Sequence, residues 1–257
     1  MVLCLCMDIS IIIVSWNVRG LLEKCLASLY SHTEGITFEV IVVDNASSDG
    51  SVEMAQEKFQ DMQVIALDEN KGFATANNIG IKESSGKYIL LLNPDTELTE
   101  NSLKKVFDKM ESNESIGILG CKLLNTDGTL QDSVRKFPRV QDLFALFFKL
   151  YKLFPSLLHY YLAKDFDYRR EAEVDQVMGA FFCINRSVID KIGPLDSKYF
   201  IWFEEVDFCR RAKRAGFKIV YWPGTSIIHH GGQSFGQVQT AKKQWWFFRS
   251  ALRYLTK

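Results

Sequence analysis

Short apolar stretches that alternate with stretches of helical spacing are the feature that most constrains how this chain can fold. The first, "ISIIIVSW", begins at Ile9 and is rich in β-branched residues. Four similar stretches follow, at residues 38–47, 62–68, 87–93 and 116–124. A strand that is apolar at successive positions is buried on both faces, as in a parallel sheet covered by helices on each side. The sequence therefore predicts an α/β fold with a mostly parallel central sheet flanked by helices.

Polar residues follow four of these strands, at the point where each strand ends. The clusters are Ser15-Trp16-Asn17, Asp44-Asn45, Asp68-Glu69-Asn70 and Asn93-Pro94-Asp95. Parallel strands direct their carboxyl ends to one edge of the sheet, and ligands bind at that edge. Each cluster alone is also typical of a turn or a helix cap. Four clusters at one edge indicate a binding site.

Asp44 follows the second strand and is a candidate for binding the base or the ribose of a nucleotide. The glycine-rich patterns of dinucleotide-binding and P-loop proteins, G-x-G-x-x-G and G-x-x-x-x-G-K-[ST], do not occur in this sequence. A nucleotide would then be held by side chains at the strand ends. The alternative role for Asp44 is to cap the helix that begins near residue 48.

"YILLLNPDTEL", residues 88–98, places Asp95 directly after the fourth predicted strand. Pro94 has a fixed φ and stiffens the turn. A carboxylate on a rigid turn suits Mg²⁺, which binds one or two carboxylates together with substrate phosphates. Asp95 is therefore a candidate ligand for Mg²⁺ or Mn²⁺, although Asn-Pro-Asp is also an ordinary turn sequence.

"WFEEVDFCRRAKRAG", residues 202–216, predicts a helix with Glu204, Glu205 and Asp207 in its first turn. Basic residues lie toward its other end, so the acids also complement the helix macrodipole. Adjacent carboxylates beside aromatic residues can have a raised pKa, because burial and a like charge both disfavour ionisation. The pair Glu204 and Glu205 is therefore a candidate general base.

"IIHHGGQS", residues 227–234, places His229 at the end of a further predicted strand. Histidine is a common metal ligand and can also contact phosphate. The glycine pair that follows permits a ligand to approach the backbone closely. A structural role is the alternative for a single histidine.

Two aromatic segments stand out in the second half, which we interpret as a lobe built on the first sheet. Residues 140–163 are rich in Leu, Phe and Tyr with interspersed lysines, and residues 242–254 read "KKQWWFFRSALRY". Both suit a membrane interface, and packing against the second lobe or another subunit is the alternative. Neither is long and apolar enough to cross a bilayer.

Charge and cysteine content limit the class of protein. The chain has 31 basic and 31 acidic residues, so its net charge gives no reason to expect nucleic acid as a partner. Its six cysteines lack zinc-site or disulfide spacing, which favours a cytosolic enzyme with reduced cysteines. The N-terminal stretch that carries Cys4 and Cys6 lacks the basic residues and cleavage site of a signal peptide, and Met7 is a plausible natural start.

Together these motifs resemble the family 2 glycosyltransferases of the GT-A fold, and particularly the rhamnosyltransferase-like members. The resemblance rests on "IIIVSWN", "VIVVDNASSDGS", "NKGFATANNIGI", "YILLLNPDTEL", "VMGAFFCINRSVI", "FEEVDFCRRAKRAGF" and "HHGGQS", which occur in the family's order. It implies one Rossmann-like GT-A domain over residues 7–236. The nucleotide-sugar-binding half would span 7–125, the acceptor-side half 126–236, and residues 237–257 would form a C-terminal helical segment.

The resemblance implies transfer of a sugar, with inversion, from a nucleotide diphosphate sugar to an acceptor hydroxyl. Glu205, or else Glu204, would be the base. Asp95 would match the family's metal-binding aspartate for Mg²⁺ or Mn²⁺, and His229 a histidine that helps bind metal in some members. The nucleotide-sugar site would comprise Ser15, Asn17, Asp44, Asn70, Gly72, Asn77, Asn93 and Asp95. The acceptor side would include Gly179, Trp202 and Asp207.

Two positions depart from the family's pattern, because Asn93 and Glu205 stand where aspartate is usual. A nucleotide-sugar-binding protein without catalysis is therefore one alternative. A metal-dependent phosphatase or nucleotidyltransferase is another, since a strand-end aspartate with Mg²⁺ serves those reactions too. The resemblance further implies a glycan or lipid-linked acceptor and a cytoplasmic protein that contacts the membrane peripherally. Alternatively, the aromatic segments would form the contact between copies of the chain in a homo-oligomer.

Overall fold

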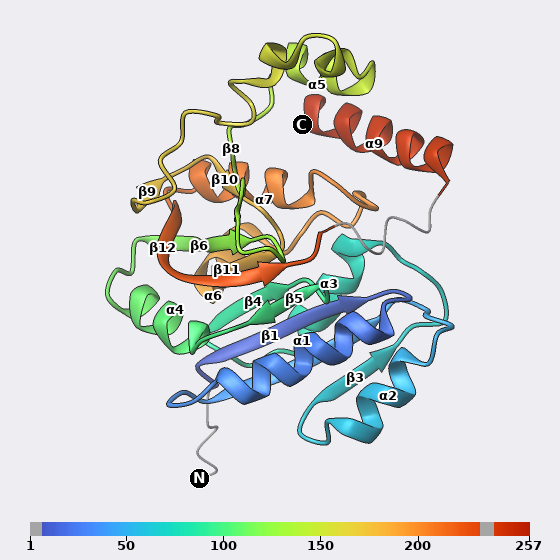
Figure 1. The fold of residues 1–257 in the computed structure, drawn as a ribbon, viewed down its shortest axis with the longest axis vertical. Coiled ribbons are helices and arrows are strands. Elements are labelled where there is room, and N and C mark those ends of the chain that lie inside the picture. The colour runs from blue at the N-terminus through green and yellow to red at the C-terminus, as the bar shows by residue number, and fades with distance from the viewer. Residues whose placement is uncertain (1–6, 232–238) are drawn as a thin grey trace.

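One large sheet runs through the molecule, and helices cover both of its faces (Figure 1). The structure is a computed structural model that describes residues 7–231 and 239–257. Cys4 and Cys6 lie outside the described residues, as do the last three residues of "HHGGQS" and the junction between the two predicted segments at 236 and 237.

The five strands predicted from the sequence all belong to this sheet, and the second half adds others. The strand order is β3-β2-β1-β4-β11-β6-β12-β5. The bounds are Ile9–Ser15 (β1), Phe38–Asp44 (β2), Gln63–Ala66 (β3), Tyr88–Leu92 (β4), Thr96–Leu98 (β5), Ile116–Leu124 (β6), Phe181–Asn185 (β11) and Lys218–His229 (β12). β1 pairs in parallel with β2 and β4, and β2 with β3. The predicted α/β fold is confirmed, with β11 inserted antiparallel between β4 and β6.

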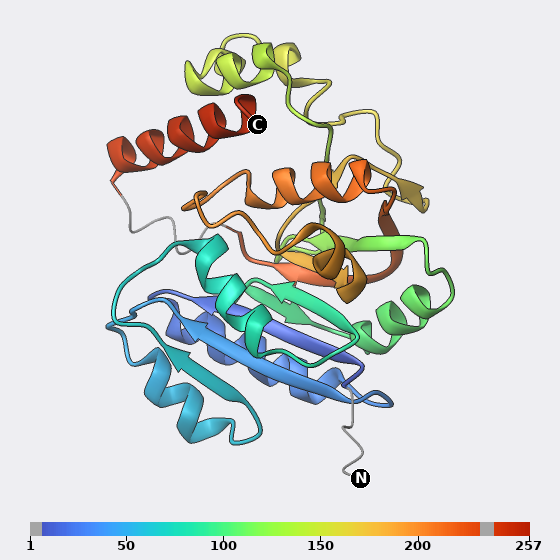
Figure 2. The ribbon, with the colours of Figure 1, turned by 180° about the vertical axis from the view of Figure 1, so that it is seen from behind.

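Alternate residues of each central strand face two different hydrophobic layers. On β1, Ile11 and Ile13 belong to the layer that includes α1, α2 and α4, whereas Ile12 belongs to the layer that includes α3, α6 and α7. These helices span Arg19–His32 (α1), Ser51–Lys58 (α2), Phe73–Glu83 (α3), Ser102–Glu111 (α4), Arg186–Ile192 (α6) and Glu204–Arg214 (α7). Figure 2 shows α3 and α7 on the face opposite α1. Burial on both faces explains why the strands are apolar at successive positions.

A smaller lobe from the second half lies at one end of the molecule (Figure 1). Its elements are Val134–Arg135 (β8), Val140–Phe147 (α5), Leu150–Lys152 (η1), Pro155–Leu158 (η2), Gln176–Val177 (β10) and Thr240–Leu255 (α9). The short strands Leu130–Gln131 (β7) and Ala172–Glu173 (β9) join the large sheet, where they pair with β6 and β12. β8 and β10 form a separate two-stranded sheet. The two aromatic segments meet here, since the rings of Phe147 on α5 and Phe248 on α9 are 5.4 Å apart.

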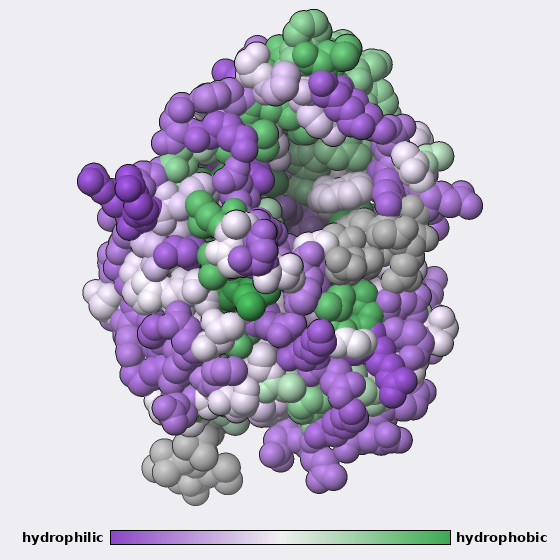
Figure 3. Space-filling view, in the orientation of Figure 1, coloured by the Kyte–Doolittle hydropathy of each residue, from purple (hydrophilic) through white to green (hydrophobic). Residues whose placement is uncertain are grey.

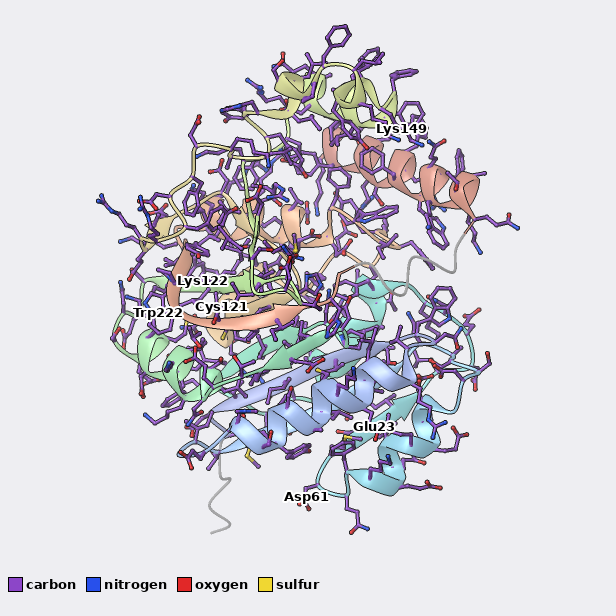
Figure 4. The ribbon with its side chains drawn as sticks, in the orientation of Figure 1. Glu23, Asp61, Cys121, Lys122, Lys149 and Trp222 are labelled. Atoms are coloured by element: carbon purple, nitrogen blue, oxygen red, sulfur yellow. The ribbon has the colours of Figure 1, made fainter. Side chains whose placement is uncertain are left out.

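β12 connects this lobe to the carboxyl ends of the parallel strands. It runs parallel to β6, with Trp222 opposite Cys121 (Figure 4), and its register shifts after Trp222. Its last residues pair antiparallel with β5, so that His229 lies opposite Thr96. This pairing brings His229 beside Asp95, which directly precedes β5.

Candidate active site

Buried polar atoms without a partner mark the candidate site. Among the described residues, eight buried side-chain nitrogen or oxygen atoms have no hydrogen-bond partner. Six of them belong to residues that the sequence singled out: Ser15, Asp44, Asp95, Glu204, Glu205 and His229. A buried polar group left unpaired costs about 1–3 kcal/mol. Their concentration in these residues indicates groups that are kept for a ligand.

Ser15 and Asp44 lie side by side at the carboxyl ends of β1 and β2, where the parallel register pairs them. Asp44 is 2% exposed. Its Oδ1 accepts a hydrogen bond from the Ser47 main-chain nitrogen at 2.8 Å, whereas its Oδ2 has no partner. Asp44 therefore orders the loop after β2 and still has one oxygen for a ligand. Its predicted alternative role as a helix cap is wrong, because α2 begins at Ser51 and its N-cap residue is Gly50.

Asn17 and Asn70 hold the surrounding loops together. Asn17 has a left-handed backbone with φ of 51°, and its Oδ1 accepts a bond from the Ser48 main-chain nitrogen at 2.8 Å. Asn70 Oδ1 accepts bonds from Asn45 Nδ2 and from the Gly72 nitrogen, both at 3.0 Å. The loops after the first three strands are thus joined into one rim.

Gly72 and Asn77 have packing roles at the start of α3. Gly72 has φ of 82°, and a Cβ at this position would lie 2.4 Å from the Phe200 carbonyl oxygen. The Phe73 nitrogen donates to that same oxygen at 2.8 Å. Asn77 is buried, and its Nδ2 donates to the Phe73 carbonyl at 2.9 Å. Gly72 therefore permits α3 to begin against the loop that leads into α7, whereas the Asn77 side chain supports the first turn of α3 itself.

Asp95 and His229 form the candidate metal site. Asp95 Oδ1 lies 3.4 Å from His229 Nε2, and neither atom has a hydrogen-bond partner. Both side chains are buried. No cluster of three or more His, Cys, Asp or Glu side chains is present within 7–231 and 239–257. A divalent ion would therefore bind to these two residues and take its other ligands from water and substrate phosphates, as Mg²⁺ commonly does.

Gln131 sets the orientation of the His229 ring. Its Nε2 donates to Asn125 Oδ1 at 3.0 Å, which directs its Oε1 toward His229 Nδ1 at 2.6 Å. Neutral His229 then carries its proton on Nδ1, and Nε2 presents a lone pair toward Asp95. This is the arrangement of a metal-ligating histidine supported by an outer hydrogen bond. The residues present fit a divalent cation.

Glu204 and Glu205 begin α7 and line a cavity of about 730 Å³ together with Asn93 and His229. Burial raises the pKa of Glu204 well above its usual value, and the neighbouring Glu205 carboxylate raises it further. Burial also raises the pKa of Glu205. The pair therefore holds a proton more strongly than ordinary glutamates do.

The acceptor-side residues predicted from the sequence separate into two groups. Gly179 and Trp202 line the same cavity as the acid pair. Asp207 does not line it, because its carboxylate faces Arg211 at 2.9 Å and Lys257 at 2.8 Å. That ion-pair cluster ties α7 to the last residue of the chain.

Gln131 and Arg135 also line the cavity, and neither was singled out from the sequence. The stretch that carries them, "TDGTLQDSVRKFP", reads as a turn with short polar strands. The one feature of this stretch that could have indicated a site residue is the charged side chain of Arg135 at the end of a short strand. The sequence could not show that β7 and β8 face the acid pair, because that depends on the pairing of β7 with β6 and of β8 with β10.

Comparison with known proteins yields one family and several relatives. A model of the family described as "Glycosyl transferase family 2" matches residues 10–193. Rhamnosyltransferase WbbL of Escherichia coli strain K12 is 28% identical over 258 residues, which cover 96% of this chain and 92% of the relative. N-acetylglucosaminyl-diphospho-decaprenol L-rhamnosyltransferase of Mycobacterium tuberculosis strain H37Rv is 25% identical over 240 residues, or 88% and 77% of the two chains.

Solved glycosyltransferase structures share the fold. The mannosyltransferase PcManGT of Pyrobaculum calidifontis, in complex with GDP-Man and Mn²⁺, matches with a TM-score of 0.64 at 16% identity, over 96% of this chain and 64% of that chain. This chain spans 44% to 72% of the length of the solved chains that it matches. At this identity the likeness concerns the fold alone, and it confirms the predicted GT-A fold.

Proposed function

The chain belongs to glycosyl transferase family 2, and on this premise we propose that it is an inverting enzyme. It would move a sugar from a nucleotide diphosphate sugar to an acceptor hydroxyl. One observation carries the proposal. The paired acids Glu204 and Glu205 line the same cavity as Asn93 and His229. A base and the residues expected beside the donor diphosphate therefore face one cavity.

The donor would lie across the carboxyl ends of the parallel strands. The unpartnered atoms of Ser15 and Asp44 suit the base or ribose of the nucleotide. These two residues end β1 and β2, and Asn93 follows the adjacent strand β4 and lines the cavity. Asp95 and His229 would hold Mg²⁺ or Mn²⁺ with oxygens of the diphosphate. When bound, such an ion offsets the negative charge that develops on a departing diphosphate.

Glu205 would act as the general base. Burial and the charge of Glu205 both raise the pKa of Glu204. We therefore infer that Glu204 is the protonated member of the pair. Glu205 then takes the proton of the acceptor hydroxyl. The acceptor oxygen forms its bond to the anomeric carbon while the bond from that carbon to the diphosphate oxygen breaks, and the bonding electrons leave with the diphosphate. A single displacement of this kind inverts the anomeric centre.

The names of the relatives suggest which sugar is transferred and which class of acceptor receives it. Two of them are rhamnosyltransferases by name, so we propose rhamnose as the transferred sugar. The mycobacterial relative is named for a diphospho-decaprenol-linked N-acetylglucosamine. We propose a lipid-linked acceptor for this chain too, in the synthesis of a cell-surface polysaccharide or glycolipid.

The surface of the smaller lobe supports contact with the membrane that would hold such an acceptor. Of thirteen exposed large hydrophobic side chains among the described residues, twelve lie in 140–160 and 245–255. We call these twelve residues the apolar cap. Figure 3 shows the green surface at the end that carries α5, above a hollow, and Figure 4 places Lys149 at that same end. No described helix is long and apolar enough to span a bilayer. We propose peripheral contact with the cytoplasmic face of a membrane.

Replacement of the base tests the proposed reaction. Glu205→Gln should lower kcat by roughly 10²–10⁴-fold, the usual contribution of general base catalysis, while the Kd for the donor stays unchanged. The donor is found by screening nucleotide sugars with Mn²⁺ and detecting released nucleotide diphosphate by mass spectrometry. Calorimetry then gives its Kd.

Glu205→Asp is the matched variant, because it restores the carboxylate that is usual at this position of the family. It should recover part of the lost rate. Undiminished transfer by Glu205→Gln would remove Glu205 as the base. A wild-type protein that binds a nucleotide sugar without turning it over would instead be the non-catalytic binding protein.

A further inference from the structure

Arg135 brings a positive charge into the cavity that the proposed reaction does not use. Its side chain lines the cavity that Glu204 and Glu205 also line. Its Nη1 donates to the main-chain oxygen of Val134 at 2.8 Å. Within 7–231 and 239–257 no carboxylate forms an ion pair with it, and the rest of the chain contains no Asp or Glu. Of the five N–H donors of its guanidinium, most therefore have no acceptor among the residues that the structure describes.

The acids of the surrounding segments are already paired with other cations. Asp132 lies 2.6 Å from Lys164, Asp142 lies 3.0 Å from Arg139, and Asp175 lies 2.9 Å from Lys213. These pairs leave Arg135 as a cation without a counter-ion from the neighbouring strands and loops.

Arg135 is also not the counter-ion of the acid pair. Both acids have raised pKa values, whereas a nearby cation that served to ionise them would lower those values. Arg135 nevertheless lies near Glu205, because both line the same cavity and both affect the hydroxyl group of Tyr161. Burial and the Glu205 charge together raise the pKa of the Tyr161 hydroxyl to about 12, and the Arg135 charge opposes that rise. The cation is therefore available for a ligand close to the base.

The location of Arg135 indicates which ligand it would bind. The donor diphosphate is expected near Asp95 and His229, at the ends of β4 and β12. Arg135 instead ends β8, from which the chain leads directly to Val140, the first residue of the apolar cap. Figure 1 shows β8 between the end of β12 and α5. Arg135 therefore shares the cavity with the acid pair, and the chain that carries it continues to the apolar cap.

We propose that Arg135 binds a phosphate group of the acceptor, so that the enzyme selects acceptors whose sugar is joined through a diphosphate to a lipid. This inference rests on the proposed function. A base and a guanidinium in one cavity, on a chain that continues to an apolar surface, suit the sugar, the diphosphate and the lipid of such a molecule. Arginine suits the role because its planar guanidinium binds phosphate oxygens in pairs. The acceptor sugar would then be positioned at Glu205 by its phosphate, as well as by its hydroxyls.

Two probes that differ only in the presence of a diphosphate group test this inference. One is N-acetylglucosamine joined through a diphosphate to a short alkyl chain, and the other is the same sugar joined directly to the same chain. Calorimetry with the full-length protein, in the presence and absence of nucleotide, gives Kd for both. The wild type should bind the diphosphate probe at least about tenfold more tightly, as expected for hydrogen bonds to a charged group. Arg135→Gln should remove that preference, and Arg135→Lys should keep part of it.

Lys136→Gln is the matched control, since it removes the same charge one residue away and Lys136 lines a different cavity. It should keep the full preference. N-acetylglucosamine diphosphate without the alkyl chain separates recognition of phosphate from binding of the lipid. The inference is overturned if the wild type binds both alkyl probes equally, if Arg135→Gln keeps the preference, or if Arg135→Gln weakens donor binding instead. Donor binding by the wild type, measured separately, shows whether the proposed function itself has failed.

Discussion

His229 reaches the site with one ring nitrogen already occupied, because Gln131 Oε1 lies 2.6 Å from its Nδ1. The amide of Gln131 is itself oriented by Asn125, 3.0 Å away. This leaves Nε2 of His229 and Oδ1 of Asp95 unpartnered at 3.4 Å from each other. Gln131 and Asn125 therefore orient the candidate metal ligand His229 without binding the metal themselves.

Gln131→Leu should weaken the binding of Mn²⁺ by roughly 10–100-fold, the usual effect of losing an outer-shell partner of a metal ligand. The leucine leaves the histidine ring free to rotate and to change tautomer. Electron paramagnetic resonance titration of Mn²⁺, in the presence of the nucleoside diphosphate identified by the donor screen, measures this affinity without requiring turnover.

Gln131→Glu is the informative companion variant, because a carboxylate oxygen can still accept the bond from Nδ1. Its Mn²⁺ affinity should stay near that of the wild type. Equal weakening in the Glu and Leu variants would contradict the orienting role and would leave Gln131 with a packing role alone.

α9 contacts the active-site loop with one face and forms part of the apolar cap with the other. Phe247 lies with its ring 5.5 Å from that of Phe203, and Ser250 Oγ donates to the Ile201 carbonyl at 2.8 Å. The loop needs this support, because Trp202 and Phe203 have left-handed backbones with φ of 62° and 72°. Such strained residues cost about 1–3 kcal/mol each and persist only where their surroundings hold them. They directly precede the acid pair.

Phe247→Ala should lower kcat on the order of tenfold, because small displacements of a catalytic group are costly, while the donor Kd stays unchanged. Phe247 would be a positioning residue that acts through the loop before Glu204. Steady-state kinetics at saturating donor, with donor Kd from calorimetry, measures the two effects separately.

Phe248→Ala provides the comparison, since Phe248 is the next residue along α9 and is 41% exposed on the other face. Its kcat with a water-soluble acceptor should match the wild type. If both variants lost the same activity, α9 would stabilise the fold generally rather than support this loop.

Charge is distributed unevenly over the whole molecule despite a net charge of zero. No Asp or Glu occurs after Asp207, and none occurs between Asp142 and Asp165. The apolar cap is therefore accompanied by lysines and arginines with few acids near it in sequence. Apolar side chains together with cations are the usual means by which a protein surface binds anionic lipid.

The double variant Trp245→Glu and Leu252→Glu should lose binding to vesicles that contain anionic lipid. It places two negative charges on exposed positions of the cap, which then repel the lipid surface and resist burial. Flotation of the full-length protein with vesicles measures this binding. Binding by the wild type should also weaken as salt is raised, since salt screens surface charges.

Leu130→Glu is the control, because Leu130 is the exposed large hydrophobic residue outside the cap among those that the structure describes. It should float as the wild type does. Wild-type protein that stays unbound while sedimenting as a dimer would show that the cap is an interface between two copies of the chain.

Much of the fold could be read from local pattern. The runs of apolar residues predict β1, β2, β4 and β6, because burial on both faces requires successive apolar side chains. Polar clusters after the strands predict where a ligand binds, because parallel strands end at one edge. The motif order is sufficient to indicate the family and the candidate roles of Asp44, Asp95 and Glu205.

Contacts between distant segments were decided only by the tertiary structure. The antiparallel pairing of β12 with β5 brings His229 to Asp95, and short strands place Gln131 and Arg135 in the cavity of the acid pair. The docking of α9 supports the loop before Glu204. None of these leaves a local periodicity, since each depends on which side chains meet after the chain has folded. The sequence by itself determined the sheet and the residues at its edge, whereas the tertiary structure decided which of them face one another.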